Sequence, residues 1–99
     1  MKILLVCNAG MSSSILVDKI KEVSVNENVV VSATSSKGLS DEVGKWDVCL
    51  IGPQISYAVE KIKAELGIPV ISIPPRDYAM ANGKSVLELA KKLYNMEEK

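Results

Sequence analysis

Four short apolar runs recur along the chain, separated by longer segments of mixed polarity. Each run is rich in valine, isoleucine or leucine, which is typical of a strand buried on both faces of a parallel sheet. We therefore predict four β-strands, the last of which ends at the Pro74-Pro75 pair. The four runs are residues 3–6, 29–31, 48–51 and 70–73.

Three of the intervening segments carry apolar residues at helical spacing. Charged residues occupy the other positions, as expected for helices that place one face on a core. Gly67 follows the second pattern, and a glycine there is typical of the carboxyl end of a helix. The apolar positions are Leu16, Ile20 and Val23 in the first helix, Ile55, Val59, Ile62 and Leu66 in the second, and Val86, Ala90 and Leu93 in the last, flanked by Leu87 and Tyr94.

A shorter helix over residues 40–44 is predicted between the second and third strands, docked by Leu39, Val43 and Trp46. The order is then βαβαβαβα, which implies a parallel sheet with helices on both faces. The predicted strand order is 2-1-3-4, a shortened flavodoxin-like sheet that low-molecular-weight phosphatases share. Residues 1–99 are expected to form one domain. Ligands bind such sheets outside the carboxyl ends of strands 1 and 3, where the strand order reverses.

The charge balance and the residue counts exclude several classes of function. Twelve basic residues balance twelve acidic ones, so the chain lacks the basic excess of a nucleic-acid-binding protein. It contains no histidine, which excludes histidine triads, histidine metal sites and phosphohistidine carriers. Cys7 and Cys49 are too far apart for a CxxC or zinc pair. We expect neither a metal nor a cofactor.

The apolar run at residues 3–6 is too short for the core of a signal peptide or for a bilayer span. A cytoplasmic protein that does not itself span a membrane is therefore expected. No predicted helix shows a second apolar stripe, so we also expect a monomer.

The candidate chemistry lies directly after the first predicted strand. Small side chains there let successive backbone N–H groups converge, and the following helix adds the positive end of its dipole. This combination predicts an anion cradle, with a thiol at its lip whose pKa is lowered in favour of the thiolate. Cys49, inside the third apolar run, is expected to be a packed and inert thiol. The loop consists of Cys7, Asn8, Ala9, Gly10, Met11, Ser12, Ser13 and Ser14.

Three segments of the chain resemble one family of bacterial proteins. The string from Cys7 to Ser14, preceded by Lys-Ile-Leu-Leu-Val, is similar to the phosphocysteine loop of lactose/cellobiose-type enzyme IIB components of the sugar phosphotransferase system. The segment Gly-Pro-Gln-Ile at residues 52–55 resembles that family's segment after strand 3. Residues 78–83 resemble its Tyr-Gly-x-x-Asp-Gly segment before the last helix, with differences at Ala79 and Asn82.

The resemblance implies a phosphoryl carrier. Cys7 would accept a phosphoryl group from a phosphohistidine of enzyme IIA and pass it to a sugar bound by the membrane permease IIC. The backbone N–H groups of the loop would hold the phosphate oxygens, with hydrogen bonds added by Ser12, Ser13 and Ser14. We also expect Gln54 and Tyr78 at the rim of the site, because they follow the third and fourth strands.

The main alternative is an enzyme like the low-molecular-weight phosphotyrosine phosphatases. Their loop has the form Cys-x5-Arg-Ser, in which the arginine binds two phosphoryl oxygens. Ser13 stands at the arginine position here, and Ser14 follows it. Asp77 beside Tyr78 imitates the phosphatase general acid, although a loop carboxylate or turn former is the simpler interpretation. The missing arginine favours the carrier.

Three further alternatives have weaker support. A receiver domain needs a carboxylate cluster around Mg²⁺, whereas the first strand is followed by Cys7-Asn8 and the third by Gly52-Pro53-Gln54. A thiol-redox module needs a resolving cysteine, for which Cys49 is the single candidate. A flavin site is favoured by aromatic rings, and the chain contains one tryptophan and three tyrosines.

Overall fold

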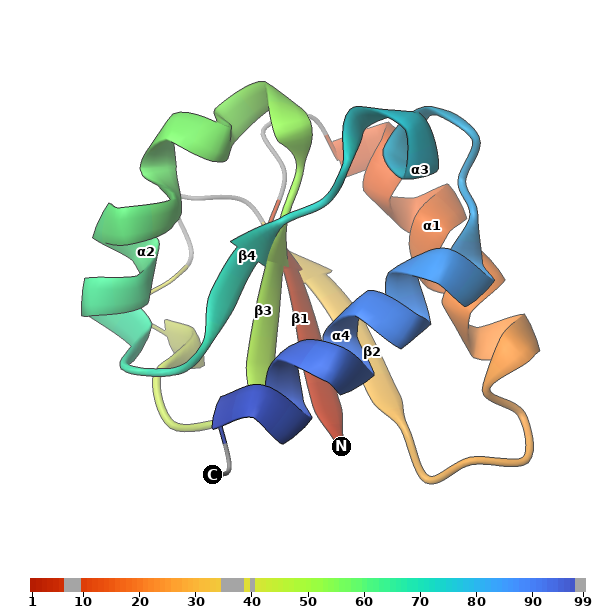
Figure 1. Ribbon diagram of the computed structural model, residues 1–99, viewed down its shortest axis with the longest axis horizontal. Helices are drawn as coiled ribbons and strands as arrows, with labels where there is room; N and C mark the ends of the chain where they lie inside the picture. The colour runs from red at the N-terminus through yellow and green to blue at the C-terminus, as the bar shows by residue number, and fades with distance from the viewer. Residues whose placement is uncertain (7–9, 35–38, 40, 98–99) are drawn as a thin grey trace.

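The protein is described by a computed structural model that covers residues 1–6, 10–34, 39 and 41–97, with residues 10–14, 96 and 97 as backbone only (Figure 1). Its strands form a four-stranded parallel sheet in the order β2-β1-β3-β4. The predicted fold class and strand order are therefore confirmed. The strands are β1 (Lys2–Val6), β2 (Val30–Thr34), β3 (Val48–Ile51) and β4 (Val70–Ser72).

The helices cover the two faces of this sheet. Helices α1 and α4 lie together on one face, and the 3-10 segment η2 continues into α2 on the other (Figure 1). None of the described helices is long and apolar enough to cross a membrane. The helical elements are α1 (Gly10–Val23), η2 (Pro53–Ala58), α2 (Val59–Leu66), α3 (Pro75–Ala79) and α4 (Gly83–Glu97).

The two central strands explain why their sequence runs are continuously apolar. Ile3 and Leu5 of β1 pack with Leu50 of β3 into the cluster beneath α1 and α4. The intervening residues, Leu4 and Val6, pack into the cluster beneath α2. Because a strand points successive side chains to opposite faces, a strand covered on both sides must be apolar at every position.

Helix burial follows the predicted stripes in most places. Leu16 and Ile20 of α1 are buried, and so are Val86 and Ala90 of α4. Gly67 ends α2 with a left-handed backbone (φ 68°), as its position predicted. The prediction for Val23 was wrong: this last residue of α1 is 44% exposed.

The structure corrects the predictions in three other segments. The second helical pattern is two elements, η2 and α2, and within η2 the backbone of Ile55 (φ −123°, ψ 30°) is not helical. Val43 is 51% exposed, whereas Leu39 is buried and Trp46 packs on the cluster beneath α2. The indole N–H of Trp46 donates to Oε1 of Glu42 at 2.7 Å. Ser40, the first residue of the short predicted helix, lies outside the described residues.

The third correction concerns α3, which the sequence did not predict. It follows β4 directly and has Pro75 in its first turn, where proline is well tolerated because the N–H it lacks has no helical partner. None of its residues is fully buried. A helix of this kind leaves no apolar periodicity in the sequence.

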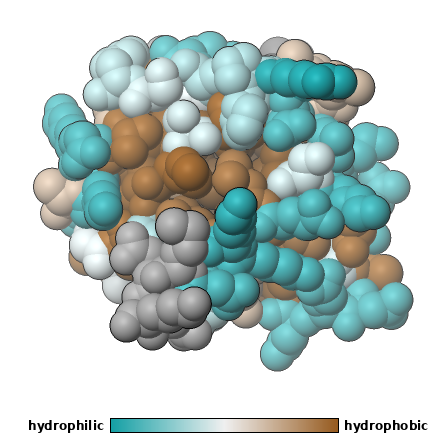
Figure 2. Space-filling view, viewed as in Figure 1, coloured by the Kyte–Doolittle hydropathy of each residue, from teal (hydrophilic) through white to brown (hydrophobic). Residues whose placement is uncertain are grey.

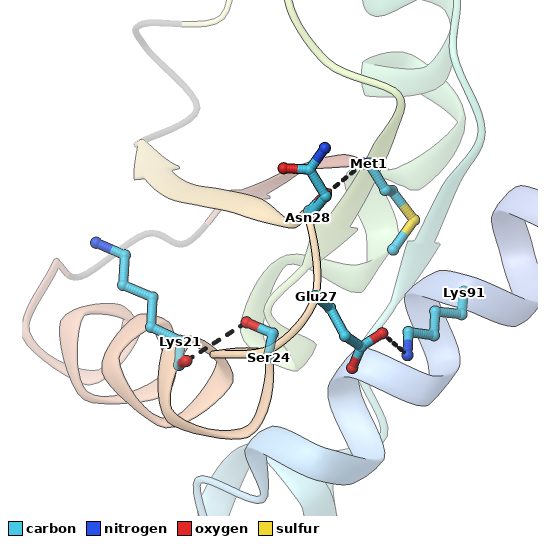
Figure 3. A network of polar contacts seen from close by, with 6 residues as sticks. All are labelled: Met1, Lys21, Ser24, Glu27, Asn28 and Lys91. Atoms are coloured by element: carbon cyan, nitrogen blue, oxygen red, sulfur yellow. Dashed lines mark hydrogen bonds and ion pairs between the residues drawn. The ribbon is translucent and has the colours of Figure 1, made fainter.

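Polar contacts at the amino edge of the sheet fix the turn between α1 and β2 (Figure 3). The hydroxyl of Ser24 donates to the carbonyl of Lys21 at 3.5 Å. The amino group of Met1 donates to the carbonyl of Asn28 at 2.9 Å. Glu27 forms an ion pair with Lys91 of α4, so this turn is tied to the last helix.

The layer of α1 and α4 covers the sheet unevenly. Figure 2 shows apolar side chains gathered over β4, between α2 and α4. Ile71 of this edge strand is half-buried, whereas Ile3 and Leu5 of β1 are fully buried. The sheet is therefore better covered at its centre than at its β4 edge.

Candidate functional site

The carboxyl ends of β1 and β3 lie side by side at one edge of the sheet, at the top of Figure 1. Val6 ends β1, and its carbonyl accepts the N–H of Gly52 at 2.9 Å. One strand further, the N–H of Ile73 donates to the carbonyl of Ile51 at 2.8 Å. These bonds extend the ladder past the strands and hold the segment after β3 against the end of β1.

Helix α1 begins at the same edge. Its first residue is Gly10, so Gly10, Met11, Ser12, Ser13 and Ser14 are helical, although they were predicted as loop. The first N–H groups of a helix have no partner within it, and the helix dipole is positive there. The first turn contains no acidic residue that would oppose an anion. Cys7, Asn8 and Ala9, between β1 and α1, lie outside the described residues.

A hollow of about 420 Å³ opens at this edge between α1, η2 and α3. It brings together Gln54 and Tyr78, the two residues predicted at the rim of the site. Gln54 is exposed, and Tyr78 is half-buried and packs against the core beneath α1 and α4. The lining residues are Ile15, Pro53, Gln54, Pro75, Tyr78, Ala79 and Ala81.

Large apolar side chains stand exposed on the elements that frame the hollow. Ile15 of α1 is 56% exposed, Tyr57 of η2 is 83% exposed, and Met80 after α3 is 67% exposed. Arg76 is also exposed, whereas Asp77 is half-buried in the first turn of α3. Adaptable apolar side chains around a hollow suit contact with another protein.

The short segment between α3 and α4 is a feature that the sequence did not reveal. Ala81 has a left-handed backbone (φ 50°), which is uncommon for a residue other than glycine. The side-chain oxygen of Asn82 accepts the N–H of Ser85 at 3.2 Å and so caps α4. Asparagine before Gly83 was a signal for this cap that could have been read from the sequence.

Cys49 is not accessible to solvent. It is fully buried in β3 and packs into the cluster beneath α2, as expected for a packed thiol. Within the described part of the chain, no group of three or more His, Cys, Asp or Glu side chains is placed to hold a metal ion. Among the described residues, neither observation indicates a second candidate site away from the carboxyl edge of the sheet.

Comparison with known proteins identifies the family of this chain. Residues 2–89 match the family described as "PTS system, Lactose/Cellobiose specific IIB subunit". The chain belongs to this family. The resemblance inferred from the three sequence segments is therefore confirmed, and it extends over most of the chain.

Curated relatives agree with the family match. The chain is 38% identical over 94 residues to the oligo-beta-mannoside-specific EIIB component of Bacillus subtilis (strain 168), with 90% of this chain and 91% of the relative covered. It is 34% identical over 103 residues to the cellobiose-specific EIIB component of Lactococcus lactis subsp. lactis (strain IL1403), with 94% and 95% covered.

Solved IIB structures share the fold. The solution structure of the cellobiose-specific IIB component from Borrelia burgdorferi superposes with a TM-score of 0.80 at 40% identity, covering 96% of this chain and 92% of that one. The lactose-specific IIB domain from Streptococcus pneumoniae superposes with a TM-score of 0.76 at 21% identity, covering 89% and 95%. At that identity the second likeness concerns the fold alone.

Family membership gives the coarse function. A IIB component of the phosphotransferase system is a phosphoryl carrier in sugar uptake, and so a transferase component. The phosphatase alternative is not favoured, because the family and the curated relatives are IIB components. As a IIB component, the chain works with IIA and IIC partners.

Proposed function

We propose that Cys7 is the phosphorylated residue of this IIB component. The observation that supports it most is the meeting of the end of β1, the start of α1 and the segment after β3 at one edge of the sheet. The segment that joins β1 to α1 begins with Cys7, and the other cysteine is buried in a strand. A nucleophile at the start of this segment would lie in the field of the positive end of α1.

The proposed reaction has two transfers. The Cys7 thiolate attacks the phosphorus of the phosphohistidine on IIA; an S–P bond forms, the P–N bond breaks, and the imidazole nitrogen leaves with the electron pair. A hydroxyl of the sugar bound to IIC then attacks the phosphorus, the S–P bond breaks and the thiolate is regenerated. The hydroxyl proton passes to a base on the permease side or to water. The carrier itself must only hold the phosphate.

The proposed cradle consists of backbone N–H groups from Asn8 to Ser14, with the serine hydroxyls adding hydrogen bonds. Support comes from the helical start at Gly10, because the N–H groups of a first turn are free to bind an anion. Gln54 and Tyr78 form the rim on the side of the shared hollow. We propose no metal or cofactor in this reaction.

The partners dock on the same face in this proposal. Ile15 lines the hollow, and Tyr57 and Met80 stand exposed on the segments beside it, so an apolar partner surface would bury them as it brings its phosphohistidine or sugar to Cys7. We also place the protein in the cytoplasm, as a single domain over residues 1–99. We expect it to be a monomer, and sedimentation of the 10.7 kDa chain would check that oligomeric state.

The names of similar relatives specify different sugars. In this proposal the permease, not the IIB component, selects the sugar.

Intact mass spectrometry tests the proposal. The protein is incubated with phosphorylated IIA, and the wild type should gain the mass of one phosphoryl group. Cys7→Ser should gain none, whereas Cys49→Ala, the matched cysteine control, should label like the wild type. Equal labelling of wild type and Cys7→Ser would show that another residue is the acceptor.

A further inference from the structure

Gly83 lies at a close approach between α4 and α1. A Cβ atom at this position would lie 2.5 Å from the carbonyl carbon of Lys19, 2.6 Å from the carbonyl oxygen of Lys19 and 2.8 Å from the nitrogen of Ile20. Real Cβ atoms essentially never approach other atoms within 3.0 Å. All three neighbours are backbone atoms, which cannot turn aside as a side chain can. Any residue except glycine would therefore push α1 and α4 apart.

The segment before Gly83 runs along α1 on the side of the site. We call residues 80–82 the α3–α4 connector. It lines one hollow with Lys19, Glu22 and Val23 of α1. Its Ala81 also lines the hollow of the candidate site with Ile15. The connector therefore shares one hollow with α1 near the site and another near the last turn of the helix.

Hydrogen bonds hold the connector in one shape. The N–H of Ala81 donates to the carbonyl of Tyr78 at 3.1 Å, and the N–H of Asn82 donates to the carbonyl of Asp77 at 3.0 Å. The Asn82 cap at 3.2 Å fixes the first turn of α4. The left-handed backbone of Ala81 persists within this frame; strained residues of this kind persist where their surroundings determine them, and they cluster at functional sites.

The far end of α1 is anchored separately. The turn that follows α1 carries Glu27, whose carboxylate pairs with Lys91 of α4 (Figure 3). Leu16, Val17 and Ile20 pack with Val86 and Leu87 of α4 between the two helices and the sheet. A shift of α1 near Lys19, with this following turn held, displaces the amino end of the helix, which is the end at the site.

We propose that Gly83 is a positioning residue for phosphoryl transfer. Its contact with the backbone of Lys19 and Ile20 sets where the amino end of α1 stands relative to β1, and thereby places the Cys7 thiol and the phosphate cradle. The inference rests on the proposed role of Cys7. Gly83 touches none of the reacting atoms in this proposal and acts through α1.

The test compares Gly83→Ala with Gly67→Ala. Gly67 has a left-handed backbone (φ 68°) at the end of α2, and a Cβ there would meet nothing within 4 Å. Both variants lose stability, but only the first displaces α1. Each is measured at a temperature at which circular dichroism shows it fully folded. The two readouts are phosphoryl transfer from phosphorylated IIA and iodoacetamide alkylation of Cys7, followed by peptide mapping.

For Gly83→Ala we expect kcat to fall about 10–100-fold with KM changed less than about twofold, because a displaced nucleophile loses near-attack geometry while docking is kept. Alkylation of Cys7 at neutral pH should slow as well, because the thiolate loses the field of α1. Gly67→Ala should match the wild type in both readouts. Equal behaviour of the two variants would overturn the positioning role.

A pair of variants at Asn82 covers the case in which Gly83→Ala does not fold. Asn82→Ala removes the cap of α4 and should slow both readouts in the same direction, whereas Asn82→Asp keeps an acceptor for the Ser85 N–H and should restore them. Identical rates for Asn82→Ala and the wild type would overturn the inference. If wild-type Cys7 accepts no phosphoryl group, the proposed function fails, and the alkylation rates alone still decide the positioning role.

Discussion

At the scale of single residues, Ala81 gives the sharpest prediction about stability. Its left-handed backbone (φ 50°) costs an L-residue with a Cβ roughly 1–2 kcal/mol. Ala81→Gly removes that cost and raises the entropy of the unfolded chain, which offsets about 0.4–1 kcal/mol. We expect a net gain of about 0.5–1 kcal/mol in the free energy of unfolding, measured by urea titration.

Ala79 provides the matched control for this substitution. It lies in α3, is exposed, and has no positive φ. Ala79→Gly should therefore lower the free energy of unfolding by about 0.5–1 kcal/mol. A loss of the same size in Ala81→Gly would mean that the backbone of Ala81 is not strained.

Single residues also mark the limit of what the sequence could predict. Burial of Cys49 and the helix end at Gly67 followed from neighbouring residues, since a mid-strand thiol packs and a glycine after an apolar stripe ends a helix. The role of Gly83 depends on how closely α1 and α4 approach, and no local pattern encodes that distance. The exposure of Val23 likewise depends on where α1 leaves the core.

At the scale of elements, the first turn of α1 allows the backbone cradle to be tested without breaking the fold. Gly10→Pro places proline at the first helical position, where it is tolerated, but removes one N–H donor. Since a hydrogen bond to a charged group contributes about 1.5–3 kcal/mol, phosphoryl acceptance should fall about 10–100-fold. The initial rate of transfer from phosphorylated IIA measures this.

Ser13→Ala is the comparison for this variant. It removes a hydroxyl but keeps every backbone donor and the backbone geometry of the turn, so acceptance should fall less than in Gly10→Pro. Both variants should keep the circular dichroism spectrum of the wild type. A larger effect of the serine variant than of the proline variant would indicate that side chains, not backbone N–H groups, hold the phosphate.

The strands differ in how much a truncation costs. Leu50 of β3 is fully buried beneath α1 and α4, so Leu50→Ala should lower the free energy of unfolding by about 2–5 kcal/mol. Val30 begins the edge strand β2 and is 53% exposed, so Val30→Ala should cost less than about 1 kcal/mol. Urea unfolding of the two variants gives the comparison, and similar losses would contradict the described burial.

The more deeply an element is buried, the more accurately the sequence predicted it. Strands β1 and β3 were predicted within one residue at each end, because two covered faces demand an apolar residue at every position. Helix α3 was missed because its five residues bury no side chain fully. The kink at Ile55 was not predicted, because the apolar stripe runs through it unchanged: Ile55 is buried like Ile62.

At the scale of the whole molecule, carrier and phosphatase differ in what happens to the phosphocysteine. Ser13 occupies the place of the phosphatase arginine, so the loop lacks the group that stabilises charge during water attack. We expect no Cys7-dependent turnover of a chromogenic aryl phosphate, with Cys7→Ser as the blank. Turnover at rates typical of enzymes, about 1–10³ s⁻¹, would contradict the carrier assignment.

The architecture as a whole could be predicted because few sheet topologies satisfy the rules for connecting parallel strands. Four apolar runs joined by helical crossovers leave a parallel sheet as the simple solution, and its switch point marks the site edge. The hollow between α1, η2 and α3 was not predictable in shape, because α3 and the connector form much of its wall. Gln54 and Tyr78 were nonetheless expected near that edge from the order of the strands.

The placement of Trp46 determines what optical measurements of this protein report. It is the single tryptophan, and it packs on the α2 side of the sheet with its indole N–H bonded to Glu42. Its fluorescence therefore reports on the α2 side of the sheet and should not change when α1, on the opposite side, is slightly displaced. A variant with unchanged emission but slowed chemistry at Cys7 would have kept the α2 layer intact while the opposite layer moved.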